Sequence, residues 1–163
     1  MSKRIYITES QFNQLMSGAS SKENYASAAA YVFAYDENKV PHVLTVQRYY
    51  DGTRSVPTGL RERRDADSCA TAKRECGEET GVNVEGCKAI NGGDQEWKDR
   101  IGRTQIGKNW IFMYNKPIEG MEFKGDGEND DIRWTPLEDL PKYPWWYGMD
   151  KTIMAFAEKY INI

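Results

Sequence analysis

A short helix with well-defined ends is predicted in the middle of a chain whose other segments are mostly β-rich. The segment SCATAKRECGEE, residues 68–79, has the residue pattern of a helix. Asp67 or Ser68 can cap its first turn, and Gly81 stands where a helix usually stops. Runs typical of strands lie on both sides, at about 27–35, 43–49, 82–90, 95–102, 109–117 and 131–137. One internal helix among strands favours the α/β class with a mixed sheet.

The two ends of the chain add further elements to this pattern. The turn-forming DENKVP, residues 36–41, joins the first two β-rich runs into a hairpin. The last segment, residues 148–161, is predicted to be an amphipathic helix with a buried stripe of Ile153, Met154, Phe156, Ala157 and Tyr160. Another short helix is predicted within ITESQFNQLMS, residues 7–17. We therefore expect a sheet sandwiched between helices, in a single domain covering residues 1–163.

Charge, hydropathy and cysteine content argue against several classes of protein. With 22 basic and 25 acidic residues the net charge is -3, so there is no general attraction to nucleic acid or to an anionic membrane. No apolar run approaches the roughly 20 residues that span a bilayer, and the first residues lack the apolar centre of a signal peptide, so a cytoplasmic protein is expected. Cys69 and Cys76 lie about 10 Å apart along the predicted helix and cannot form a disulfide with each other.

Three carboxylates crowd the end of the central helix. Glu75, Glu78 and Glu79 lie within five positions, where each like-charged pair costs roughly 0.2–0.5 kcal/mol. Successive residues turn by 100° around the helix axis, so Glu75 and Glu79 lie side by side and Glu78 flanks them. A divalent cation would offset this repulsion, and Mg²⁺ needs only one or two carboxylates besides substrate phosphates. A solvated acidic face is the alternative interpretation.

The order of residues around these acids is more specific than their charge. RECGEETGV, residues 74–82, resembles the second half of the Nudix box, Arg-Glu-apolar-x-Glu-Glu-x-Gly-apolar, at every specified position. Two features upstream depart from that pattern. Gly59 lies fifteen residues before Arg74 instead of fourteen, and the acid at the seventh box position is absent, with Asp65 and Asp67 flanking Ala66 instead. A one-residue insertion in LRERRDA, residues 60–66, would reconcile the spacing.

The resemblance implies a Nudix-type α/β/α sandwich that binds Mg²⁺ or Mn²⁺ and hydrolyses a nucleoside diphosphate linked to another group. By resemblance, Glu75 and Glu79 are direct metal ligands, and Glu78 is a ligand or is bound through water. Gly59 belongs to the same metal site. Arg74 would orient Glu75 through a charge-assisted hydrogen bond, and Arg74 and Glu78 are also expected to take part in catalysis.

Further site residues are expected in the loops and strands around the box. The stretch ENDDIR, residues 128–133, is similar to a segment of ADP-ribose-hydrolysing family members, and Glu128 is the residue expected to act as general base, with Asp130 in reserve. Arg48 and Arg54 are candidates for a phosphate, although solvated arginines are the simpler account. Trp110 is a candidate for stacking on a base, although aromatic residues on strands usually belong to the core.

The expected function is Mg²⁺-dependent hydrolysis of a phosphoanhydride bond in a small nucleotide such as ADP-ribose, a diadenosine polyphosphate or NADH. Two alternatives stay open. One is a pyrophosphohydrolase acting on RNA 5′ ends, for which RERR at 61–64 is the basic cluster. The other is a non-catalytic nucleotide-sensing module, although such modules usually lose the glutamates that this chain keeps. The protein is expected to be a monomer or homodimer.

Overall fold

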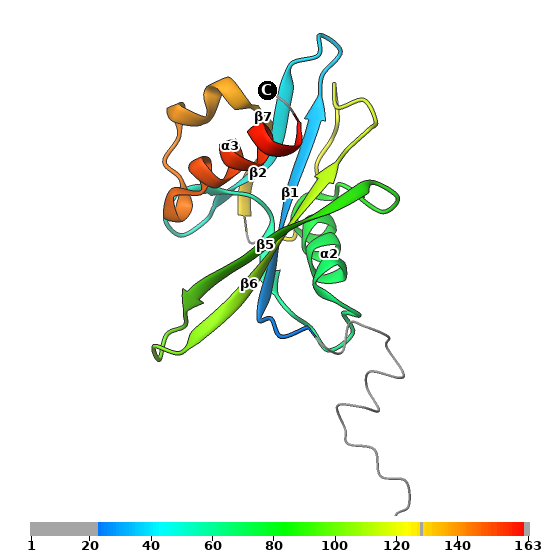
Figure 1. Ribbon diagram of the computed structural model, residues 1–163. Helices are drawn as coiled ribbons and strands as arrows, with labels where there is room; N and C mark the ends of the chain where they lie inside the picture. The colour runs from blue at the N-terminus through cyan, green and yellow to red at the C-terminus, as the bar shows by residue number, and fades with distance from the viewer. Residues whose placement is uncertain (1–22, 128, 162–163) are drawn as a thin grey trace, which may run out of the picture.

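The computed structural model describes residues 23–127 and 129–161, and its centre is a mixed β-sheet (Figure 1). The predicted helix at 7–17 lies outside the described residues. In the described part the sheet has seven strands: β1 (Ser27–Tyr35), β2 (Pro41–Arg48), β3 (Arg54–Ser55), β4 (Thr58–Leu60), β5 (Lys88–Lys98), β6 (Thr104–Met113) and β7 (Asn129–Pro136). The helices in these described ranges are α2 (Ser68–Thr80), α3 (Met149–Tyr160) and the 3-10 turns η2 (Leu137–Lys142) and η3 (Trp146–Gly148).

Strand pairing makes the sheet mixed, as expected from the sequence. The main strand order is β3-β2-β1-β6-β5, while β4 pairs with β1 and β7 pairs with β2. The β1–β2 hairpin is antiparallel, with Phe33 opposite Val43, whereas β1 and β6 run parallel. A parallel pair requires a long crossover connection. The chain between β1 and β6 supplies it and includes α2.

Alternation along β1 explains how both faces of the sheet are covered. Ala29, Tyr31 and Phe33 pack into a core that includes Ile153 and Ala157 of α3. The intervening residues of β1 point to the other face, where they pack with Ala72 and Cys76 of α2. Side chains of a strand alternate between faces, so a strand that is apolar at every position needs a layer on each side. The helices α2 and α3 therefore lie on opposite faces of the sheet.

The ends of α2 lie where the sequence pattern placed them. The side chain of Asp67 accepts a hydrogen bond from Ala70 N at 2.8 Å, so Asp67 is the N-cap. Gly81 ends the helix in the left-handed region, with φ 79°, where a side chain would be strained. In α3, Ile153 and Ala157 are buried, and the other residues of the predicted stripe pack half-buried against the same core.

Residues 82–90 and 95–102 differ from the strand prediction. Strand β5 begins only at Lys88, and the preceding segment is a loop in which Val82 and Val84 are buried against α2. The alternation of that segment thus reflects loop packing and not strand pairing. The segment 95–102 is not a separate strand either. It contains the end of β5 and the turn into β6, since β5 runs without interruption to Lys98. None of the described helices is both long and apolar enough to cross a lipid bilayer.

Candidate metal centre

Glu75 and Glu79 lie one helical turn apart on α2, on the side that faces β4. The Thr58 backbone N–H donates to Glu79 Oε1 at 3.3 Å, and the Glu79 residue is only 6% exposed. Gly59 leaves the space that the Glu75 carboxylate occupies, because a Cβ at Gly59 would lie 2.1 Å from Glu75 Cδ. The glycine in β4 and the glutamate on α2 are therefore sterically matched.

Burial and mutual repulsion change the acidity of this pair. Burial raises the pKa of Glu79 above its usual value, and the charge of Glu75 raises it further. Burial also raises the pKa of Glu75, against the lowering effect of Arg74. In the described part of the chain, no lysine or arginine forms an ion pair with Glu79. Glu79 is thus buried beside a second carboxylate whose basic partner is Arg74, and a divalent cation would stabilise this arrangement.

Glu78 is held by two arginines in this structure. Its carboxylate accepts hydrogen bonds from Arg74 Nη1 at 3.1 Å and from Arg64 Nη2 at 3.0 Å. Glu78 still lies beside Glu75, since both carboxylates accept from Arg74 Nη1, and its expected role in the metal site stays a prediction. Within the described ranges, no three histidine, cysteine or acidic side chains gather into a metal-binding cluster. Two carboxylates still fit Mg²⁺, which keeps several waters and completes its shell with substrate phosphates.

Arg74 holds Glu75 from the side. Its Nη1 donates to Glu75 Oε1 at 2.9 Å, which is the hydrogen bond expected from the sequence. Its Nη2 also donates to the Leu60 carbonyl at 2.9 Å, which links α2 to the end of β4. The Arg74 side chain is only 12% exposed, so these contacts fix the guanidinium beside the carboxylate pair.

Asp65 is the main partner of Arg74, and the sequence analysis did not assign it a role. Its carboxylate accepts from Arg74 Nε and Nη2, both at 2.9 Å, in a two-pronged ion pair whose acidic side chain is 4% exposed. Burial alone would raise the pKa of Asp65, but the hydrogen bonds from Arg74, Glu62 N–H and Thr71 outweigh it and lower the pKa to about 2. The box loop, residues 60–66, thus folds back so that the carboxylate of Asp65 reaches Arg74. The sequence held one signal for this ion pair, because Asp65 lies in the loop that leads directly into the helix carrying Arg74.

The acidic loop before β7 approaches the same end of α2. A Cβ at Gly125 would lie 2.9 Å from the Glu79 carbonyl oxygen, so the loop packs directly on the helix. The charge of Asp126 contributes to the raised pKa of Glu79, which places Asp126 near the carboxylate pair. Glu128 lies outside the described residues, and its assignment as general base stays a proposal.

The three candidate substrate contacts have different surroundings from those expected. Arg54 is 2% exposed, and its guanidinium donates to Thr45 Oγ1 at 3.0 Å and to the Asp131 carbonyl at 2.7 Å. Both interpretations of Arg54, as a phosphate ligand and as a solvated arginine, are therefore wrong, because its donors stabilise the interior between β2 and β7. Trp110 is half-buried and donates its indole N–H to Ser68 Oγ at 2.9 Å, so it packs under the start of α2. Arg48 lies over the ring of Trp146.

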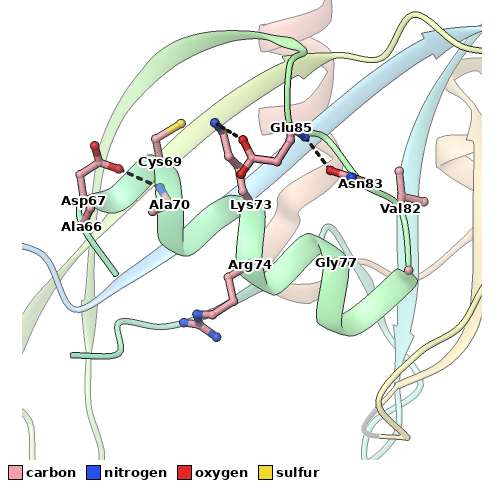
Figure 2. Close-up of a pocket in the computed structure, with 11 residues that line it drawn as sticks. Ala66, Asp67, Cys69, Ala70, Lys73, Arg74, Gly77, Val82, Asn83 and Glu85 are labelled. Carbon is pink, nitrogen blue, oxygen red and sulfur yellow. Dashed lines mark hydrogen bonds and ion pairs between the residues drawn. The ribbon is translucent and has the colours of Figure 1, made fainter. Parts of the chain in front are cut away.

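A surface groove runs along α2, and Figure 2 shows the side chains that line it. It is bounded by the outer side of the helix and the loop after it, where Lys73 and Glu85 form an ion pair at 3.1 Å. Cys69 also lines it, and burial raises the pKa of this thiol to about 11, so it stays protonated at neutral pH. Neither Glu75 nor Glu79 lines the groove. We therefore place the candidate site at the carboxylates and not in this groove.

Comparison with known proteins identifies the family. A model of the NUDIX domain matches residues 25–156. The chain belongs to the Nudix family. The resemblance seen in residues 74–82 is thereby confirmed, and with it membership of a family of pyrophosphohydrolases, which act on acid anhydrides. A search of curated proteins finds no match.

Solved structures share the fold of this Nudix domain. The NUDIX domain of Shewanella oneidensis NrtR complexed with ADP ribose has a TM-score of 0.70 at 18% identity, over 94% of this chain and 99% of that one. A Caenorhabditis elegans Ap4A hydrolase binary complex has a TM-score of 0.66 at 18% identity, over 84% and 98%. The Escherichia coli dihydroneopterin triphosphate pyrophosphohydrolase has a TM-score of 0.63 at 18% identity, over 86% and 100%. The α/β/α sandwich expected from the sequence is confirmed.

Proposed function

We propose that this Nudix protein is a divalent-metal-dependent pyrophosphohydrolase acting on a nucleoside diphosphate derivative. The observation that supports this most directly is the buried Glu79 carboxylate beside Glu75, without a basic side chain paired to Glu79 among the described residues. Dinucleotides and nucleotide sugars, such as diadenosine polyphosphates, NADH and ADP-ribose, are the proposed substrates. Structural neighbours described with ADP ribose and as an Ap4A hydrolase support testing these compounds first.

The residues of this chain that would hold Mg²⁺ or Mn²⁺ are Glu75 and Glu79, with the backbone of Gly59 beside them. Glu78 could join them after release from Arg64 and Arg74, which are its partners in this structure. When bound, the cation supplies charge neutralisation at the phosphate oxygens and acidifies a water molecule.

The remaining roles belong to the side chains around the pair. Arg74, fixed by Asp65, keeps the Glu75 carboxylate in its place against Gly59. The loop before β7 brings Asp126 near Glu79, and Glu128, two residues further along the chain, is proposed to accept the proton of the attacking water. Hydrolysis then releases a nucleoside monophosphate and the other phosphorylated half.

The RNA 5′-end alternative gains no support from the contacts of the basic cluster. Arg64 is paired with Glu62 and Glu78, and Arg61 stacks over the ring of Tyr25. The charge of Arg64 is thus balanced by two carboxylates, and Arg61 already stacks on a ring. Part of the RERR segment at 61–64 is therefore engaged within the protein. The sensing-module alternative is tested by turnover itself.

A substrate panel tests the proposal. The protein would be incubated with Mg²⁺, with Mn²⁺ or with EDTA and, in turn, ADP-ribose, diadenosine tetraphosphate, NADH, a nucleoside triphosphate and capped RNA, and the products would be separated by ion-exchange chromatography. We expect metal-dependent release of a nucleoside monophosphate from at least one of the first three. Tight binding without turnover of any compound would contradict hydrolysis and favour the sensing module.

Divalent cations are expected to stabilise the folded protein. A ligand that binds only the folded state at about 100 times its dissociation constant adds roughly 2.7 kcal/mol. For a chain of this size, that corresponds to a rise in Tm of about 5–11 °C. Differential scanning calorimetry with increasing Mg²⁺ or Mn²⁺ measures this shift, and K⁺ at equal ionic strength is the control. An equal effect of K⁺ would contradict a specific site.

The Gly59→Ala variant is expected to weaken metal binding roughly 10- to 100-fold, the range typical for loss of a ligand's positioning partner. The new Cβ would lie 2.1 Å from Glu75 Cδ and would force that carboxylate out of place. Isothermal titration calorimetry with Mn²⁺ measures the effect.

Gly77→Ala is the matched control for this variant. No heavy atom lies within 4 Å of a Cβ at Gly77, and alanine in a helix is more stable than glycine by about 0.5–1 kcal/mol. We expect Gly77→Ala to keep the parental affinity. Equal Mn²⁺ affinities of Gly59→Ala and Gly77→Ala would show that Glu75 is not a ligand.

A further inference from the structure

The outer edge of β5 has no partner strand within the described residues. Strand β5 is the last in the order β3-β2-β1-β6-β5, and it pairs with β6 alone. From Asp94 to Lys98, the backbone groups on that edge form no hydrogen bond to the described part of the chain. An unpaired strand edge is a template on which another strand can pair.

The free end of the β5–β6 hairpin is exposed on both faces. Figure 1 shows this hairpin projecting to one side of the domain, with its closing turn away from α2 and α3. Residues 93–96 and Lys98 are exposed, and Trp97 between them is half-buried. Strand β1 begins at Ser27, opposite Gly107 of β6, so the last residues of the hairpin form a two-stranded ribbon. Such a ribbon is only marginally stable by itself and gains from a third strand.

The register with β6 determines which backbone groups face the free edge. The Asp99 N–H donates to the Arg103 carbonyl at 3.0 Å, and hydrogen-bonded pairs alternate along an antiparallel ladder. Glu96 and Ile106 therefore form a non-hydrogen-bonded pair. The Ile106 carbonyl agrees with this assignment, because it accepts from the Ala26 N–H on the other side of β6. By the same alternation, the outward backbone groups of β5 near the turn belong to residues 94, 96 and 98.

The side chains beside these backbone groups are ordered by charge. Asp94 and Glu96 are acidic, and Lys98 and Arg100 follow at the same two-residue spacing. Within the described residues, Glu96 forms no ion pair. Charged side chains on an edge usually prevent pairing with other strands. Here the acids precede the bases, so a second copy that runs antiparallel can place its bases opposite the acids of the first.

Only one twofold centre between residues 94 and 99 avoids like charges. Centred on Trp97, an antiparallel pair places Glu96 opposite Lys98 of the partner subunit, and Asp94 near the partner's Arg100. Centres at 94, 96 and 98 place a charged residue opposite itself. The centre at 95 opposes two acids, and the centre at 99 opposes two bases. Like charges directly opposite each other destabilise a strand pair.

We propose that the free edge of β5 is a homodimer interface, in which the β5 strands of two copies pair antiparallel about a twofold axis at Trp97. The outward backbone groups supply the hydrogen bonds, and Glu96 and Lys98 fix the register. A second copy suits this edge better than an unrelated peptide, because twofold symmetry supplies the complementary charge order automatically. The proposal concerns assembly and does not depend on the proposed hydrolysis.

The mass of the protein in solution tests the proposal. Sedimentation velocity over a range of concentrations is expected to show the parent passing from one chain of 18.7 kDa to twice that mass. Glu96→Lys and Lys98→Glu each convert two contacts of the dimer from opposite to like charges. Each is expected to weaken dimerisation roughly 5- to 500-fold. The double variant Glu96→Lys/Lys98→Glu restores opposite charges and is expected to regain the parental dimer.

Mixing the two single variants separates this register from a folding defect. In a mixed dimer, each basic side chain of the first variant faces an acidic side chain of the second. We therefore expect the mixture to form heterodimers at a concentration at which each variant alone is monomeric. Glu158→Lys makes the same charge change at an exposed position of α3 and is expected to keep the parental dimer.

Hydrogen exchange locates the contact on the chain. In a dimer, the outward amides of residues 94, 96 and 98 would be hydrogen-bonded across the interface. We expect them to be protected in the parent and in the double variant, and to exchange faster in Glu96→Lys and in Lys98→Glu at the same protein concentration.

Three outcomes would overturn the β5 interface. The first is a parent that stays monomeric at every concentration. The second is a dimer whose stability neither single variant changes, which would place the contact between copies elsewhere on the surface. The third is a mixture of the two single variants that stays monomeric although circular dichroism shows both to be folded.

Discussion

The Glu79→Gln variant is expected to lose hydrolysis by on the order of 10³-fold or more while its metal-free form becomes more stable. The activity falls because one of the two carboxylates proposed to hold the cation is removed. Stability rises because the parent buries an acid beside Glu75 without a basic partner, whereas the glutamine amide can donate to the Glu75 carboxylate. Each kcal/mol recovered should raise the Tm by about 2–4 °C.

Two measurements check this prediction, turnover of the substrate found in the panel and calorimetry in EDTA. Glu85→Gln is the matched control, since it makes the same chemical change in an exposed ion pair with Lys73, which contributes little. We also expect Mg²⁺ to raise the Tm of the parent and of Glu85→Gln but not that of Glu79→Gln. Parental turnover by Glu79→Gln would remove the metal centre from the carboxylate pair.

The Asp65→Asn variant is expected to lose about 2–4 kcal/mol of stability at neutral pH. Asp65 accepts two hydrogen bonds from Arg74 in an ion pair with side-chain exposures of 12% and 4%, so its replacement leaves a largely buried guanidinium without its main counterion. Urea unfolding at pH 7 measures the loss. Asp67→Asn is the control, because asparagine caps a helix about as well as aspartate and should leave stability nearly unchanged.

The pH dependence of this loss has a definite sign. Burial opposes the charge of Asp65, but the hydrogen bonds from Arg74, Glu62 N–H and Thr71 lower its pKa to about 2 in the folded protein, below the value near 3.9 of an unfolded chain. A lowered folded pKa contributes stability that is fully present above pH 4 and disappears as the pH falls through 2. The difference in unfolding free energy between the parent and Asp65→Asn should therefore shrink from pH 5 to pH 2. A difference that stays constant over this range would contradict the ion pair.

The sequence predicted the features that depend on local periodicity. The helix at α2, its Asp67 cap and its Gly81 stop follow from rules that act within one or two turns. Glu75 and Glu79 lie side by side because the helix repeat places residues four apart on one face. The β1–β2 hairpin and α3 followed from turn residues and apolar spacing in the same way. The Nudix box supplied the family, because its fixed residues lie almost entirely within α2.

Only the tertiary structure decided which side chains meet across these elements. The Arg54 guanidinium donates to Thr45 and Asp131, and Glu78 accepts from Arg64 in the loop before α2. Nothing in the sequence next to these residues requires either contact.

The loop before α2 and the contact between β2 and η3 show the same limit. Asp65 reaches Arg74 only because the box loop folds back, and Arg48 at the end of β2 lies over the ring of Trp146 in η3. Residue type and spacing thus determined α2, α3, the β1–β2 hairpin and the proximity of Glu75 to Glu79. Burial and pairing between distant segments depend on the packed fold, which no local pattern encodes.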